Sequence, residues 1–167
     1  MTIDAGAEFE PGAAYQVYGD NEIENILVYG TLDVTYCNVS ASKDDLSGQY
    51  LYNSGSSYAE ILYYNQGTLK FNGAAQQEAT LNYSSQGGNS KPINIEIANT
   101  SDTVRFTVKE SLTNNLTVDN GAVLRVNALY TVTAANIIIN GTARVARVSN
   151  TSDGFTEQFI ATNSYTI

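Results

Sequence analysis

The sequence predicts an all-β protein, and three observations carry that prediction. Apolar and polar residues alternate in short runs, which is the period of a half-buried strand. No stretch keeps a 3.6-residue apolar period, and residues 73–79 offer at most one helical turn. Four segments share one pattern: an apolar run meets a glycine, and a second run of alternating small, apolar and charged residues follows. These segments are ENILVYGTLDV (24–34), EILYYNQGTLKF (60–71), NLTVDNGAVLRV (115–126) and NIIINGTARV (136–145).

Residues 1–22 are predicted to form an N-terminal arm, ahead of a β domain over residues 23–167. Glycine and proline interrupt the arm at four positions, and its apolar residues follow no sustained period. Its aromatic residues are too many for a solvated tail, so we expect the arm to lie along its own body or a neighbour. The aromatic residues expected to make that contact are Phe9, Tyr15 and Tyr18.

Within the β domain the clearest alternation falls in residues 93–98 and 103–108, which are joined by the polar connection 99–102. Glu96 and Arg105 fall on the polar faces of these two segments and are expected to pair across strands. Residues 53–57 and 84–91 are rich in Gly, Ser and Asn and are expected to be loops. The second of these loops is a candidate boundary between two halves of the domain.

Two architectures fit the repeated pattern. In a short parallel β-solenoid, or β-helix, each glycine marks a corner and matching residues stack from coil to coil. In an antiparallel β-sandwich or barrel, each copy is a hairpin with its turn at the glycine. The four glycines, Gly30, Gly67, Gly121 and Gly141, are 37, 54 and 20 residues apart. These intervals approximate two, three and one lengths of a coil of about 18–20 residues, which favours the solenoid.

The composition argues against most enzyme chemistry. There is no histidine, so the usual neutral general base and the commonest metal ligand are both missing. The single cysteine, Cys37, lies in an alternating run and is interpreted as an ordinary strand thiol. The sequence contains no motif for a catalytic nucleophile, a phosphate-binding loop or a calcium-binding loop. We therefore expect a protein that is not an enzyme and has no cofactor or metal site. A glycan-cleaving pair such as Asp33 and Glu60 is a third, unsupported option.

The charge is concentrated near the N-terminus. Residues 1–45 contain nine acidic residues and one basic residue, which accounts for −8 of the formal net charge of −9. An acidic chain repels phosphates, so nucleic acid is not expected as a partner. The acidic segment suits docking on a basic partner surface. Neither a secretory signal nor a membrane span is recognisable, so we expect synthesis in the cytoplasm and no membrane partner.

Tyrosine is the one enriched residue type with a functional character, with twelve copies. Aromatic faces beside amide side chains are typical of protein interfaces and sugar-binding surfaces. Tyrosine also suits ordinary strands, which is the simpler interpretation. The densest group, interleaved with Asn and Gln, consists of Tyr50, Tyr52, Tyr58, Tyr63 and Tyr64.

The four glycine-containing units and the acidic arm, which together span about half the chain, resemble bacteriophage virion proteins. The similar groups are β-helical spikes and fibres and the trimeric decoration (cement) proteins of capsids. The resemblance implies a non-enzymatic homotrimer in the virion that attaches through its acidic N-terminal region to a major capsid or other virion protein. The alternative is a secreted or cell-surface carbohydrate-binding or adhesin module, which would bind glycan through the Tyr50–Tyr64 group.

Overall fold

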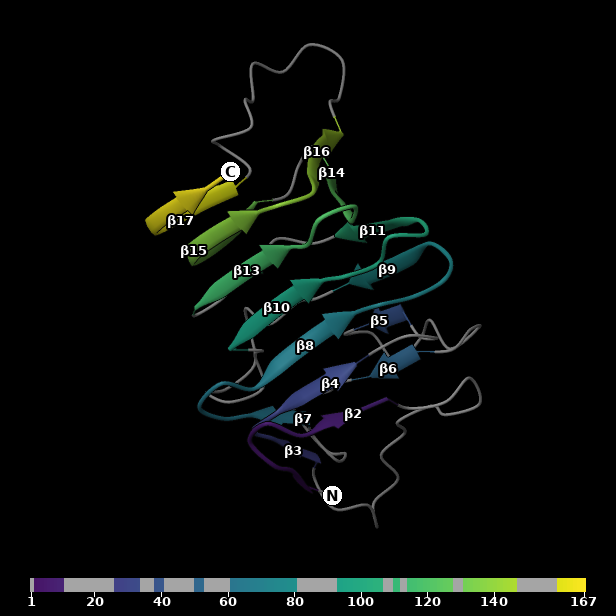
Figure 1. Ribbon diagram of the computed structural model, residues 1–167, viewed down its shortest axis with the longest axis vertical. Coiled ribbons are helices and arrows are strands. Elements are labelled where there is room, and N and C mark those ends of the chain that lie inside the picture. The colour runs from purple at the N-terminus through teal and green to yellow at the C-terminus, as the bar shows by residue number, and fades with distance from the viewer. Residues whose placement is uncertain are drawn as a thin grey trace.

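A computed structural model gives the fold of the chain. It describes residues 2–10, 26–33, 38–40, 50–52, 61–80, 93–106, 110–111, 114–127, 131–146 and 159–167. These residues form strands joined by tight corners and contain no helix. The strands belong to three sheets, and every strand pair in them is parallel. Figure 1 shows the strands stacked from β2 near the N-terminus to β17 near the C-terminus.

We name the three sheets A, B and C. Sheet A contains β1 (Thr2–Ile3), β3 (Ile26–Val28) and β7 (Ile61–Tyr63), in that order. Sheet B pairs, in order, β2 (Glu8–Phe9), β4 (Thr31–Asp33), β8 (Thr68–Phe71), β10 (Asn94–Ile97), β13 (Asn115–Val118) and β15 (Val132–Ile139). The long strand β15 also pairs with β12 (Glu110–Ser111) and β17 (Phe159–Thr166). Sheet C pairs, in order, β6 (Tyr50–Tyr52), β5 (Asn38–Ser40), β9 (Gln77–Thr80), β11 (Thr103–Phe106), β14 (Val123–Asn127) and β16 (Thr142–Ala146).

The lower coils pass through sheets A, B and C in turn, and from β8 onward the described strands belong to sheets B and C. Each passage forms one coil of a parallel β-solenoid. The coil of β3, β4 and β5 is followed by the coil of β7, β8 and β9, and each strand of the second lies beside its counterpart. Residues at matching positions stack along the solenoid, as in the column Leu32, Leu69, Ile95, Leu116 and Ile137. The predicted solenoid is confirmed, and its antiparallel alternative does not describe these sheets.

The coil length inferred from the glycines was wrong, although the fold inferred from them was right. Thr31 pairs directly with Thr68, so Gly30 and Gly67 belong to adjacent coils and their 37-residue interval is one coil. That coil is long because it contains both β5 and β6. The two coils from Ile95 through Leu116 to Ile137 each take 21 residues.

The four glycines also mark two different corners. Gly30 and Gly67 precede β4 and β8, at the corner between sheets A and B, whereas Gly121 and Gly141 lie between sheets B and C. A Cβ on Gly30 would overlap the carbonyl oxygens of Ala7 and Asp4 in the coil below. A Cβ on Gly141 would likewise overlap the carbonyl oxygens of the preceding coil, and Gly121 has a φ of +83°. The repeated glycine therefore reflects close backbone approach at each corner, together with a left-handed turn at one of them.

The core lies between the sheets and follows from the alternation. In β8, β10, β11 and β13 every second residue is buried. Phe71 of sheet B meets Phe106 of sheet C with ring centroids 6.1 Å apart. Burying each such large apolar side chain stabilises the fold by about 1.5–3 kcal/mol.

The structure also bears on the helical turn expected within residues 73–79 and on the N-terminal arm. Residues 77–80 form strand β9, so no helical turn forms there, because alternate residues Gln77 and Ala79 face the core. Ile3 is 3% exposed and β1 and β2 pair with the body, so the first residues of the predicted arm form part of the solenoid. Residues 11–22 and the candidate boundary at 84–91 lie outside the described residues.

Candidate functional site

A cluster of charged side chains joins three coils on the outer face of sheet B. Lys70 projects from β8, and its Nζ lies 3.0 Å from Oε1 of Glu8 and 3.4 Å from Oδ2 of Asp33. Glu8 is in β2 and Asp33 in β4, so one ammonium group bridges strands from successive coils. The Asp33 side chain is 3% exposed, whereas that of Glu8 is half exposed. Asn72 also donates a hydrogen bond to Asp33.

The environment of the cluster shifts the pKa values of its two carboxyl groups in opposite directions. The pKa of Asp33 is raised because burial disfavours its charged form and because it is hydrogen-bonded to Glu8. The pKa of Glu8 is lowered by its hydrogen bonds to Asp33 and Lys70. Burial alone lowers the pKa of Lys70, but the hydrogen bond to Glu8 and the charge of Asp33 outweigh burial and raise it.

Separated carboxyl titrations are also found in glycosidases, but this geometry does not suit one. Nζ of Lys70 contacts both Glu8 and Asp33, at 3.0 and 3.4 Å, so an ammonium group occupies the space between the two carboxyl groups. Glycosidase carboxyls lie at least about 5 Å apart and leave that space for the sugar. Asp33 is buried, so little of its carboxyl group is exposed for contact with a substrate. Glu60, its suggested partner, lies outside the described residues. The cluster is best explained as a link between coils.

Charged residues continue above Lys70 on sheet B and form a separate column on sheet C. On sheet B, Glu96 pairs in register with Lys70, and its pKa is raised by burial and by the negative charge of Asp119, to which it is hydrogen-bonded. On sheet C, Arg105 of β11 lies between Glu78 and Arg125. The expected pairing of Glu96 with Arg105 across strands was wrong, because β10 and β11 belong to different sheets. The register then places Arg144 beside Arg125.

A pair of stacked tyrosines lies at the corner between sheets A and B. The rings of Tyr29 and Tyr64 have centroids 5.0 Å apart and planes inclined by 17°. The Tyr64 amide donates to the carbonyl of Val28, which fixes one corner on the other. Tyr64 was among the predicted interface residues, whereas Tyr29 was missed. The signal was present, because both tyrosines directly follow the first strand of a glycine-containing unit.

The other predicted interface residues do not form one site with this pair. Phe9 is in β2, partly buried against the core. Tyr50 and Tyr52 belong to β6 of sheet C, and Tyr63 belongs to β7 of sheet A. The remaining predicted residues, Tyr15, Tyr18 and Tyr58, lie outside the described residues.

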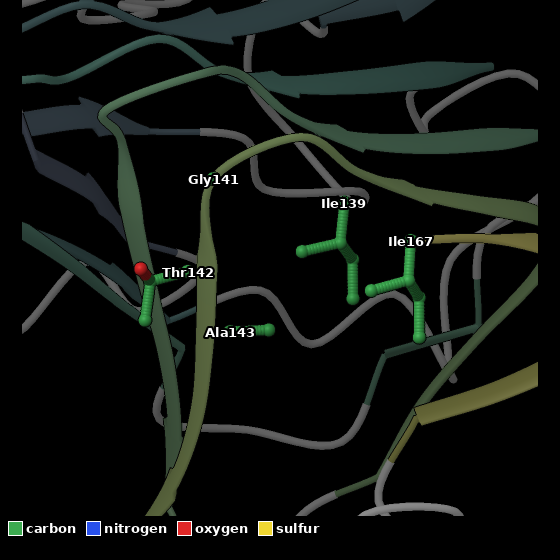
Figure 2. A pocket seen from close by; sticks show the side chains of 5 residues that line it. All are labelled: Ile139, Gly141, Thr142, Ala143 and Ile167. Atoms are coloured by element: carbon green, nitrogen blue, oxygen red, sulfur yellow. The ribbon is translucent and has the colours of Figure 1, made fainter.

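An apolar pocket of about 380 Å³ opens at the C-terminal end of the solenoid (Figure 2). Ile139 and Ile167 approach each other on one side of it, and Ala143 lies opposite them. Ile167 is 89% exposed, and Ile160 and Tyr165 of the last strand β17 are also exposed. None of the described residues that line the pocket is charged, so the pocket offers mainly apolar contacts.

The described residues contain neither a metal-ligand cluster nor a membrane-spanning helix. No group of three or more acidic, Cys or His side chains gathers there around one point where a metal ion would fit. No described helix could cross a membrane. No protein-family model matches the chain, and neither a curated protein nor a solved structure is detectably similar to it.

Proposed function

We propose that the chain is a non-enzymatic structural protein of a virion, a homotrimeric capsid decoration or fibre subunit. It attaches to a capsid or other virion protein through its acidic N-terminal region and projects its C-terminal coils. The observation that carries the proposal is the acidic first coil at one end of a parallel stack of strands.

The first coil presents its acidic residues to solvent. Asp4, Glu8 and Glu10 are all exposed, and no basic residue lies among residues 2–10. β1 and β2 are the end strands of the sheet orders, so this acidic surface is also an end of the solenoid. An end of this kind suits a basic docking surface, because charge complementarity fixes the partner and orientation.

The opposite end supports assembly in a different way. β17 follows β15 as the last strand of the stack and carries exposed Ile160 and Tyr165. Open solenoid ends expose strand edges and apolar residues that are normally capped or buried in an oligomer.

The attachment test follows from the place of β1 and β2 in the fold. Deleting residues 1–22 would remove Ile3 from the core, so a truncated chain would lose stability together with charge. We would instead measure co-sedimentation of the full chain with purified virions that lack it, using the double variant Asp4→Asn with Glu10→Gln. We expect binding to weaken about tenfold or more, since complementary charges steer association.

A matched control changes the net charge equally at exposed positions outside the first coil. The control is Gln66→Lys with Thr162→Lys, and it should bind virions as the native chain does. Equal binding by the native chain and the Asp4/Glu10 variant would refute attachment through the acidic coil. Light scattering gives the mass of the native chain, and a monomer would refute the homotrimer.

A second candidate function, carbohydrate binding, is favoured by the Tyr29–Tyr64 stack. Two half-exposed rings at one corner give an apolar platform beside polar Asn65 and Gln66, which suits a sugar ring. Binding to a glycan array that is lost in Tyr64→Ala would support this function. An array on which the native chain binds nothing would contradict it.

A further inference from the structure

Sheets B and C carry charges of opposite sign on the same coils. The coil of β8 and β9 has Lys70 on sheet B and Glu78 on sheet C. The next coil has Glu96 on sheet B and Arg105 on sheet C. The coil after that has Asp119, at the end of its sheet B strand β13, and Arg125 on its sheet C strand β14. The sign therefore inverts between the two faces at three successive heights.

The arginine column on sheet C is not neutralised within the described residues. Arg105 and Arg125 are partners in register, so their strands lie about 4.8 Å apart. No carboxylate of the described residues lies within ion-pair distance of either guanidinium. The Nε of Arg105 is shielded from solvent and has no hydrogen-bond partner there. Like charges opposite each other on adjacent strands are destabilising, so this column favours an external anion.

The acidic residues on sheet B, Glu96 and Asp119, favour an external cation. The negative charge of Asp119 and burial both raise the pKa of Glu96, and both side chains are only partly exposed. Lys70 is the nearest cation, but it already contacts Glu8 and Asp33. Two carboxylates on sheet B and two guanidinium groups on sheet C thus occupy the same two coils.

We propose that sheet B of one copy packs on sheet C of the next, with Glu96 facing Arg105 and Asp119 facing Arg125. The inference rests on the proposed homotrimer and names its contact faces. A rotation axis parallel to the solenoid keeps every residue at its own height, so each copy meets the next at matching coils. One heterologous contact, repeated around the axis, then pairs Arg105 and Arg125 of one copy with Glu96 and Asp119 of the next.

The signs also select this register over its alternatives. A slip by one coil places either Lys70 against Arg105 or Glu96 against Glu78, which are like charges. Antiparallel packing centred on Glu96 and Arg105 places Lys70 against Arg125 and Asp119 against Glu78, also like charges. Only parallel packing at equal height pairs opposite signs at all three coils. Glu78 has contacts within its own chain, so the two upper coils supply most of the attraction.

The test reverses the charges face by face in the full chain and measures mass by light scattering and sedimentation. One variant is Arg105→Glu with Arg125→Glu, and the other is Glu96→Lys with Asp119→Lys. Each should raise the concentration needed for half assembly about 100-fold or more, because like charges then meet at the contact. The variant that combines all four changes restores opposite signs and should recover the trimer. Gln66→Lys and Gln66→Glu, at the exposed opposite corner, should leave assembly unchanged.

The outcomes separate the inference from the proposed function. A native trimer that resists both reversals, or that the combined variant fails to restore, overturns the inference and leaves the homotrimer intact. A native monomer overturns both the inference and the homotrimer. If the arginine column of that monomer binds an acidic polysaccharide, the polysaccharide takes the place of the second copy. Circular dichroism checks folding of each variant, and Arg125→Gln and Asp119→Asn serve as milder substitutes where a reversal unfolds the chain.

Discussion

The lower and upper coils of sheet B are joined by different polar interactions on the same outer face. In the lower coils a charge cluster that contains the buried Asp33 joins β2, β4 and β8 through Lys70. In the upper coils the join is a ladder of amide side chains, in which Asn136 donates to Asn115 at 2.8 Å and accepts from Asn163 at 2.7 Å. Neutral amides repeat from coil to coil without accumulating charge, which suits the regular 21-residue coils. The lower coils differ in length and are joined by a different charged residue from each strand, namely Glu8, Asp33 and Lys70.

The largest loss of stability is expected at the corners, where both the lower and the upper coils require close backbone approach. Gly30→Ala in the lower coils and Gly141→Ala in the upper coils each force a Cβ into carbonyl oxygens of the neighbouring coil. We expect each to lower the free energy of unfolding by about 3 kcal/mol, at the upper end of overpacking effects. Urea denaturation followed by circular dichroism measures this loss.

Gly6→Ala is the matched control, because a Cβ at Gly6 meets nothing within 4 Å. Its φ of +80° leaves a cost of about 1–2 kcal/mol from the left-handed conformation alone. A loss at Gly30 or Gly141 no larger than that at Gly6 would contradict the close-approach argument.

The second-largest loss of stability should be confined to the lower coils. Lys70→Met removes the cation that compensates buried Asp33, and we expect a loss of about 2–3 kcal/mol, less than for a fully buried pair. Hydrogen exchange should show reduced protection in β2 and β4, while β13 and β15 keep theirs. Equal loss of protection in both regions would show that the cluster does not act locally. Lys70→Arg keeps the charge and should retain most of the stability.

Much of this comparison could be predicted from the sequence. Alternation in residues 68–71 and 94–97 located the strands, and the repeated glycines indicated stacked coils. The sequence does not distinguish Gly30 from Gly141, because both follow an apolar run and precede an alternating one. Their assignment to different corners depends on which strands pair. For the same reason the 37-residue coil was misread as two, since it contains β6 in addition to β5.

Only part of the charged columns could be predicted from the sequence. Alternation placed Glu96 and Arg105 on outward faces, which the structure confirms. The stacking of Arg105 on Arg125 follows from a 20-residue interval that no local pattern marks. Glu8, 62 residues before Lys70, is further still from any local signal. Long-range register, and not residue type, limited the prediction of these sites.

The third effect tests the amide ladder of the upper coils. Asn136→Ala removes a donor to Asn115 and an acceptor for Asn163 and Ser164. We expect a loss of about 1–2 kcal/mol, because the bonds are partly exposed to solvent that can replace them. Reduced protection should appear in β15 and β17 and spare β4. Thr117→Ala, on the same face but outside the ladder, should cost less.

The smallest effect is the pH dependence of the lower coils. The pKa of Lys70 is higher in the folded chain than the ordinary value of 10.5. A raised folded pKa means that the stabilisation is complete below pH 10.5 and is lost as pH rises through the folded value. The stability difference between the native chain and Lys70→Met should therefore stay constant from pH 8 to about 10 and shrink above it, since Met does not titrate. Subtracting the variant cancels the ionisation of tyrosines common to both, and urea denaturation at each pH measures the difference. A difference that stays constant to pH 11.5 or above would indicate that the Lys70 side chain stabilises the lower coils through packing of its methylene groups rather than through its charge.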